Sequence, residues 1–161
     1  MHIATITYCE NVALVTLRNV ASEGLLIGEI FTAISDHGIN VDMISQTAPQ
    51  GGTISLAFTV STKSVGQLLP ILNGFKPAAP ELGVELTAGM TKLNFSDSGM
   101  VHTPGVAAGV FSVLSAAGVT ATMITTSTVD ISILIPAHQQ EAALGLCQSA
   151  FGTVPQEADF D

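Results

Sequence analysis

Two short loops carry the backbone and side-chain groups of this 161-residue chain that best suit the binding of a small anion. They are residues 21–24 (ASEG) and 99–105 (GMVHTPG), and each precedes a segment with helical periodicity. The start of a helix offers unpaired backbone N–H groups and the positive end of the helix dipole, which suit a carboxylate. Pro104, in the expected first turn, and Gly105 beside it leave that approach open.

A second set of polar side chains follows the first of these helices. Asn40, Asp42 and Gln46 lie in or beside the strand that we expect there. The Asp42 carboxylate can hold an ammonium group, and the Gln46 amide can donate or accept hydrogen bonds. A carboxylate-binding wall and an ammonium-binding wall are what a free amino acid requires. A second interpretation stays open, in which Thr103 and Pro104 only cap a helix and Asp42 is a solvated charge.

The sequence offers little for catalysis or metal binding. The histidines His2, His37, His102 and His138 are far apart, and none lies four residues from another ligand-type residue. Zinc sites need three or four convergent ligands, so we expect no metal. No Gly-x-Ser-x-Gly motif occurs, and no Cys–His pair has a diagnostic local context. We therefore expect no catalytic residues and no cofactor.

Composition excludes several classes of partner. The chain has 4 Lys plus Arg against 13 Asp plus Glu, for a net charge of −9. Nucleic acids and anionic membranes need clustered cations, and ATP sites normally use cationic clamps. The uncharged stretch 103–129 contains too many threonines, serines and glycines for a membrane span. Two cysteines and no visible secretory signal favour the cytoplasm.

An internal duplication organises the chain. Residues 31–45 recur at 111–125 in one register, so that Phe31 matches Phe111 and Gly38 matches Gly118. Such self-similarity indicates two copies of one structural unit. Each copy reads as strand, helix, strand, strand, helix, and the glycines stand where a left-handed residue ends the first helix. The helical Gly-x-x-x-Gly spacings at 24–28 and 105–109 suggest close helix–sheet packing.

Apolar periodicity predicts which faces are buried. The first helices place apolar residues at i, i+3, i+4 and i+7, and the second helices repeat this spacing. Cys147 falls on the apolar stripe of the second helix in copy two, so we expect a core residue rather than a reactive thiol. Alternation over residues 53–60 and 131–135 predicts strands with one apolar face. The expected apolar positions are Ile27, Ile30, Phe31, Ile34, Val65, Leu68, Leu69, Leu72, Ala143, Leu146, Cys147, Ala150, Ile54, Leu56, Phe58, Val60, Ile131, Ile133 and Ile135.

These elements predict an α+β fold made of two ferredoxin-like βαββαβ units, with helices on one face of each antiparallel sheet. Copy one contains strands at 13–20, 41–48, 53–61 and 83–88, and copy two begins with a strand at 92–96. The acidic, proline-broken C-terminus is a poor strand, whereas residues 3–8 form a strand with no place in copy one. We expect residues 11–89 to be unit 1, inserted into unit 2, which comprises residues 1–10 and 90–161.

Four segments carry a resemblance to a known family. They are residues 38–46 (GINVDMISQ), 99–108 (GMVHTPGVAA), 123–127 (MITTS) and 130–135 (DISILI). Together they resemble the paired ACT domains at the C-terminus of aspartokinases, and the likeness extends from about Ile3 to Phe151. In that family the first ACT unit is inserted into the second. The resemblance implies a non-catalytic regulatory module that binds lysine, threonine or another amino acid as allosteric feedback effector.

The resemblance also implies a homodimer paired through ACT units, with effectors at the interfaces, and an aspartokinase catalytic subunit as partner. One implied site uses Ser22, Gly24, Leu25, Ile27 and Gln46, facing Thr120 and Ala121. The other uses Met100, Thr103, Pro104, Gly105, Val106 and Ala107, facing Asn40, Val41 and Asp42.

Some positions depart from the family pattern. The Asp-x-Pro-Gly loop of the first unit is Ser-Glu-Gly-Leu at residues 22–25, and the usual asparagine of the second unit is Thr120. The Thr-Ser-Glu motif has become Thr-Ser-Thr at residues 126–128. These departures leave an alternative open, in which the chain is a structural dimerisation module with degenerate effector sites. No aspartokinase catalytic segment is visible, so we expect no enzymatic activity from this chain.

Overall fold

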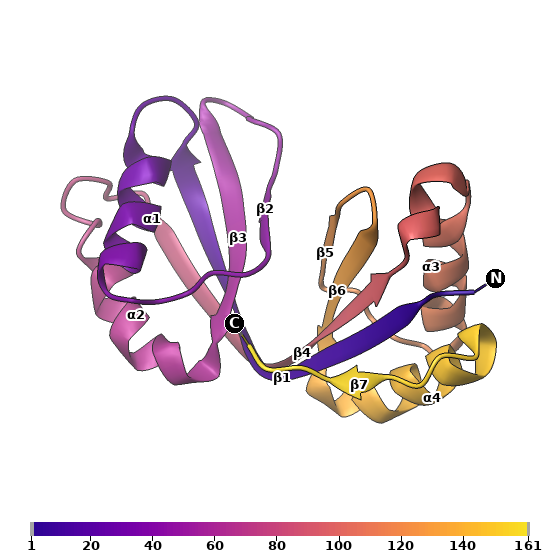
Figure 1. Ribbon diagram of the computed structural model, residues 1–161. Coiled ribbons are helices and arrows are strands. Elements are labelled where there is room, and N and C mark those ends of the chain that lie inside the picture. The colour runs from indigo at the N-terminus through magenta and orange to yellow at the C-terminus, as the bar shows by residue number, and fades with distance from the viewer. Residues whose placement is uncertain (1, 161) are drawn as a thin grey trace. The chain divides into compact units, whose positions relative to one another are not determined.

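The structure is a computed structural model that describes residues 2–160. The described chain forms two compact units, one of residues 11–88 and the other of residues 2–10 with 89–160. Strands β1 (Thr5–Ala21) and β4 (Gly83–Ser96) each contribute to both units (Figure 1). The sequence predicts two strands in place of each, and this is wrong. Asn11 (φ 57°) and Gly89 (φ 69°) take the left-handed conformation without ending the strand.

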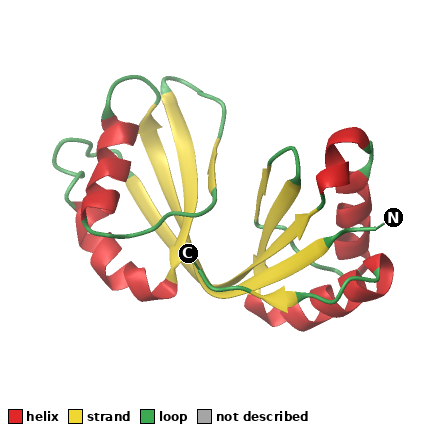
Figure 2. Ribbon diagram, in the orientation of Figure 1, coloured by secondary structure: helices red, strands yellow, loops and turns green. Residues whose placement is uncertain are grey.

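The unit of residues 11–88 is an antiparallel sheet with strand order β2-β3-β1-β4 and two helices against one face (Figures 1 and 2). Its other elements are α1 (Leu26–Asp36), β2 (Ile44–Gln46), β3 (Thr53–Ser61), a 3-10 helix (Thr62–Ser64) and α2 (Val65–Asn73). Strand β2 is shorter than the predicted strand 41–48, and it forms one edge of the sheet.

The second unit repeats this arrangement. Read from its edge strand, its order is β5-β6-β4-β1, which corresponds to β2-β3-β1-β4 in the first unit, again with two helices on one face. Its elements include a 3-10 helix (Ser98–His102), α3 (Val106–Ala116), β5 (Met123–Thr126), β6 (Asp130–Pro136), a 3-10 helix (Ala137–Gln139) and α4 (Gln140–Phe151). A short strand, β7 (Gln156–Glu157), pairs in parallel with Thr7 and Tyr8 of β1, although the C-terminus is a poor strand by sequence. The predicted α+β fold of two ferredoxin-like units is confirmed.

Each unit has its own apolar core between helices and sheet. In the first, Ile54, Leu56, Phe58 and Val60 of β3 are at most 3% exposed, as their alternation predicts. Phe31 of α1 meets the Phe58 ring edge-on, with the ring centroids 5.5 Å apart. In the second, Phe95 of β4 and Phe151 of α4 make the corresponding edge contact at 6.1 Å.

The buried face of α4 differs from the predicted stripe. Ala143 and Cys147 are fully buried and Phe151 nearly so, whereas Leu146 is 42% exposed and Ala150 is exposed. Ala143, Cys147 and Phe151 all belong to the buried core of this unit. The core face therefore follows an i, i+4, i+8 row, because residues four apart lie on the same face of a helix. The prediction for Cys147 is confirmed, and burial raises the pKa of its thiol to about 11.

Glycines end the first helix of each unit as predicted. Gly38 and Gly118 have φ of 69° and 67°, and their N–H groups donate to the carbonyls of Ser35 and Ser115. The expectation of close packing at the Gly-x-x-x-Gly spacings is wrong for Gly24, Gly28 and Gly105, because a Cβ added at any of them meets no atom within 4 Å. Within residues 2–160, the helices are too short or too polar to cross a membrane.

Candidate functional site

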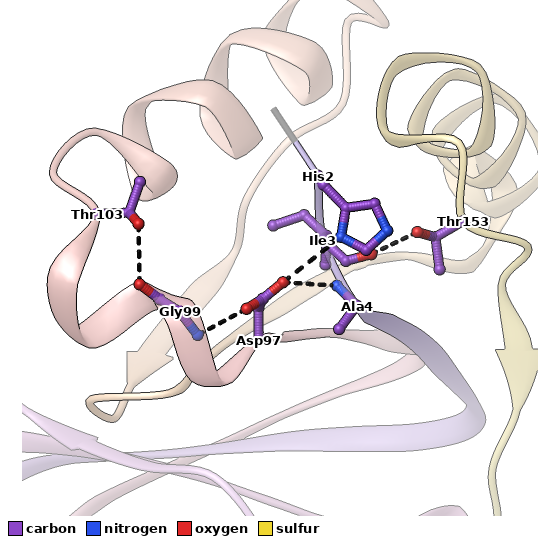
Figure 3. A network of polar contacts seen from close by, with 7 residues as sticks. All are labelled: His2, Ile3, Ala4, Asp97, Gly99, Thr103 and Thr153. Carbon is purple, nitrogen blue, oxygen red and sulfur yellow. Dashed lines mark hydrogen bonds and ion pairs between the residues drawn. The ribbon is translucent and has the colours of Figure 1, made fainter.

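The loop that leads into α3 is held by its own polar groups. The Asp97 carboxylate accepts a hydrogen bond from the Gly99 N–H at 2.7 Å, which starts the 3-10 helix Ser98–His102. The Thr103 hydroxyl donates to the Gly99 carbonyl at 2.9 Å (Figure 3). Gly105 then adopts φ 91°, a conformation that glycine takes at little cost, and the helix begins at Val106. The loop therefore presents the first turn of α3 in a defined position.

The first turn of α3 lacks a side-chain cap. Gly105 is the N-cap residue and has no side chain, and the Thr103 hydroxyl is bonded within the loop instead. The interpretation in which Thr103 caps the helix is therefore wrong. In an uncapped first turn, backbone N–H groups remain that can donate hydrogen bonds to an anion, at the positive end of the helix dipole.

A hollow of about 280 Å³ lies beside this turn. Its lining comes from the loop, the first residue of α3 and the N-terminal segment that precedes β1: His2, Asp97, Gly99, Met100, Thr103 and Val106. The structure thus brings together Met100, Thr103 and Val106, three of the residues that the family resemblance implies. Pro104, Gly105 and Ala107 are exposed next to it, without lining the hollow.

Sequence reasoning missed His2 and Asp97 as lining residues, and it included Gly99 only as the first residue of the loop 99–105. The Asp-Ser-Gly sequence at residues 97–99 is a local signal, because an Asp side chain commonly bonds a backbone N–H two residues later. His2 has no comparable signal, since its position depends on how the N-terminal strand pairs.

Residues 40–42 lie in the other unit, immediately before β2. Asn40 and Asp42 are exposed and Val41 is half-buried. The Asp42 N–H donates to the Thr59 carbonyl at 3.1 Å, and the Met43 N–H donates to the Thr59 hydroxyl at 2.9 Å. This side-chain bond interrupts the regular ladder and explains why β2 begins later than predicted. It also fixes the backbone on either side of the Asp42 side chain.

The loop before α1 corresponds to the loop before α3. The Ser22 N–H donates to the Gly52 carbonyl at 2.9 Å, Gly24 has φ 97°, and α1 also lacks a side-chain cap. The N-cap residue Leu25 is 77% exposed, which is unusual for a large apolar side chain. Ile27 packs against the core, so it supports the helix rather than lining an open surface.

The remaining implied residues are exposed at strand ends. Gln46 ends β2 in the first unit. Thr120 and Ala121 precede β5 in the second, where the Gln139 side-chain oxygen accepts from the Thr120 N–H at 2.8 Å. A shallow hollow of about 440 Å³ runs along the outer face of α1, lined by Leu25, Gly28, Glu29, Thr32, Ala33 and Asp36.

One pair of ionisable side chains outside these loops forms a structural contact. Arg18 and Glu85 make a two-pronged ion pair at 2.8 and 3.0 Å, which lowers the pKa of the Glu85 carboxyl through the hydrogen bond from Arg18. Among residues 2–160 there is no group of three or more His, Cys, Asp or Glu side chains that could hold a metal ion. The chemistry that this arrangement supports is reversible binding of a small polar molecule.

Comparison with known proteins places these features in a family. Two ACT-domain family models match the chain, one at residues 26–75 and the other at residues 94–151. The aspartokinase of Geobacillus stearothermophilus is 32% identical over 153 residues, which are 95% of this chain and 37% of that protein. The chain therefore spans about a third of the length of this curated relative.

Solved structures agree with the sequence relatives. The ligand-free regulatory subunit of aspartate kinase from Thermus thermophilus superposes with a TM-score of 0.82 at 29% identity, covering 94% of this chain and 99% of that subunit. A structure of aspartokinase alpha and beta subunits matches with a TM-score of 0.83 at 29% identity, covering 93% and 99%. The chain belongs to the ACT domain family. More particularly, its two ACT domains form a tandem pair of the aspartokinase regulatory type.

Proposed function

We propose that this chain is the amino-acid-sensing regulatory module of an aspartokinase system, and that lysine or threonine is its effector. The observation that carries the proposal is the uncapped first turn of α3 beside a hollow of about 280 Å³, in an ACT domain of the aspartokinase type. The effector carboxylate accepts from the first-turn N–H groups of α3, and Met100, Thr103 and Val106 surround its carbon atoms.

The effector ammonium binds at Asp42, in the wall of residues 40–42 that a paired ACT domain supplies. The exposed Asp42 carboxylate stands beside a backbone that Thr59 fixes, so it is placed without a large ordering cost. The net charge of −9 attracts a cationic effector more strongly than a neutral one, which favours lysine over threonine. Ser22, Gly24, Leu25 and Gln46, facing Thr120 and Ala121, form the corresponding second site, and Ile27 supports the helix beneath it.

A homodimer is the second part of the proposal. Strands β2 and β5 are edge strands of their units, and Ile44 and Ile124 on them are 49% and 42% exposed. These residues occupy equivalent positions in the two copies. An unpaired edge with an exposed apolar side chain is a surface that proteins usually cover. Pairing of ACT edges between two chains covers both.

The third part concerns the partner. Because a structure of aspartokinase alpha and beta subunits resembles this chain along 99% of the matched subunit, we propose an aspartokinase catalytic subunit as the protein that the module regulates. Effector binding favours one arrangement of the ACT domains, and the catalytic subunit responds to that arrangement. The kinase reaction itself belongs to the catalytic subunit in this proposal.

The test is titration of the purified chain with each of the twenty amino acids, followed by calorimetry and by thermal unfolding. An effector present at 100 times its dissociation constant stabilises the folded state by about 2.7 kcal/mol. Saturable binding of lysine or threonine supports the proposal. A dimer by light scattering that binds none of the amino acids shows instead a structural assembly module.

A further inference from the structure

The side chain of Asp97 joins two segments that are far apart in sequence. One carboxylate oxygen accepts from the Gly99 N–H at 2.7 Å, in the loop that leads to α3. The other accepts from the Ala4 N–H at 3.0 Å, next to the start of β1. The His2 ring nitrogen lies 3.7 Å from the same oxygen (Figure 3). Asp97 is therefore the link between the N-terminal segment and the loop.

This link lies at the edge of the hollow rather than in the apolar core. Asp97 and His2 both line it, and the Asp97 side chain is 21% exposed. The loop has a second internal bond, from the Thr103 hydroxyl to the Gly99 carbonyl. Gly99 is thus held through its N–H by Asp97 and through its carbonyl by Thr103. Losing the Asp97 side chain frees the Gly99 N–H. The loop then keeps the Thr103 side-chain bond and two backbone bonds, from the Met100 N–H to the Asp97 carbonyl and from the Thr103 N–H to the Met100 carbonyl, but no bond to the N-terminal segment through this carboxylate.

We propose that Asp97 is a positioning residue of the effector site, which fixes the loop of residues 98–105 against the N-terminal segment so that the first turn of α3 faces the hollow. This inference rests on the proposed function for the effector, but the loop geometry stands independently of it. Hydrogen bonds to a carboxylate are stronger than bonds between neutral groups. Their loss makes the loop sample conformations that do not bind, and the apparent affinity falls by the fraction that remains competent.

The test compares Asp97→Ala and Asp97→Asn with a matched control, Thr153→Val. The Thr153 hydroxyl donates to the Ile3 carbonyl, so its loss loosens the same N-terminal segment without a contact to the loop (Figure 3). Hydrogen exchange of the ligand-free full chain measures the loop directly. We expect Asp97→Ala to speed exchange in residues 99–106 at least tenfold, Asp97→Asn to have a smaller effect, and Thr153→Val to leave that segment within twofold.

Calorimetry with lysine and with threonine adds the functional readout. We expect Asp97→Ala to weaken binding of the effector at least tenfold, with Asp97→Asn between it and the unchanged protein. Loop exchange that stays the same in Asp97→Ala overturns the inference whether or not an amino acid binds. Equal weakening by Thr153→Val also overturns it, because the effect then comes from the N-terminal segment alone. Failure of the unchanged chain to bind either amino acid refutes the proposed function, and loop exchange still decides the position of Asp97.

Discussion

We expect substitution of two glycines by alanine, Gly28 and Gly105, to have opposite effects on stability, although each lies in one of the two Gly-x-x-x-Gly spacings. Gly105 has φ 91° and Gly28 lies in α1 with ordinary helical geometry, and a Cβ added at either meets no atom within 4 Å. An alanine side chain therefore clashes with no neighbour at either position, and only the backbone conformation determines the change in stability. Alanine in a left-handed conformation costs about 1–2 kcal/mol. Alanine in a helix gains about 0.5–1 kcal/mol over glycine.

We therefore expect Gly105→Ala to lower the free energy of unfolding by about 1 kcal/mol, after the loss of unfolded-state entropy offsets about 0.4–1 kcal/mol. Gly28→Ala raises it by about 0.5–1 kcal/mol. For a chain of this size, 1 kcal/mol shifts Tm by roughly 2–4 °C, so the two variants separate by several degrees. Urea unfolding followed by far-ultraviolet circular dichroism measures both. A Gly105→Ala variant as stable as the unchanged chain refutes the reasoning from backbone conformation.

Three further predictions follow from buried and exposed groups. Phe151→Ala removes a ring that is 5% exposed and its edge contact with Phe95, so urea unfolding should show a loss of about 3–5 kcal/mol. Burial raises the pKa of the Cys147 thiol from 9.0 to about 11. The thiol therefore loses its proton at lower pH in the unfolded state than in the folded state, and the free energy of unfolding falls as the pH rises from about 9 to 11. Cys147→Ala has no thiol to titrate, so between pH 8 and pH 10.5 its free energy of unfolding should fall less than that of the unchanged chain, as measured by urea unfolding at both pH values. Asp42→Ala should weaken effector binding by roughly 10- to 100-fold in calorimetry while light scattering shows the same oligomer, and unchanged affinity removes Asp42 from the site.

The duplicated pattern made much of the fold predictable. Periodicity identified the buried faces of α1 and β3, since Ile30, Ile34 and Phe58 are almost completely buried. It also placed the glycines that end α1 and α3, because a left-handed residue after a helix has a clear preference for glycine. These features depend on local geometry, which repeats along the chain and leaves a regular trace in the sequence.

Features that depend on distant pairing were harder to predict. Asn11 and Gly89 look like strand breaks, yet β1 and β4 continue through them because neighbouring strands supply hydrogen bonds on either side. β7 forms only because the edge of β1 is available at Thr7 and Tyr8. The contact from Asp97 to Ala4 spans 93 residues of sequence, and nothing near either residue indicates the other.

The candidate site was predictable in part. The sequence of residues 99–108 indicated Met100, Thr103 and Val106, which line one hollow. It did not show that the Thr103 hydroxyl bonds Gly99 and leaves α3 uncapped, because a Thr before a helix more often caps it. The opposing residues 40–42 remain a prediction for a paired ACT domain.

The chain order of the two units has a consequence for biosynthesis. Residues 11–88 form a compact unit from one uninterrupted stretch, so that unit can complete its core as soon as its last strand leaves the ribosome. Residues 2–10 are made before residues 11–88, but the rest of their own unit begins at residue 89. The segment of residues 2–10 therefore stays without the rest of its unit while residues 11–88 are translated. We expect nascent chains stalled near residue 120 to protect the first unit from protease and to leave that leading segment open to cleavage.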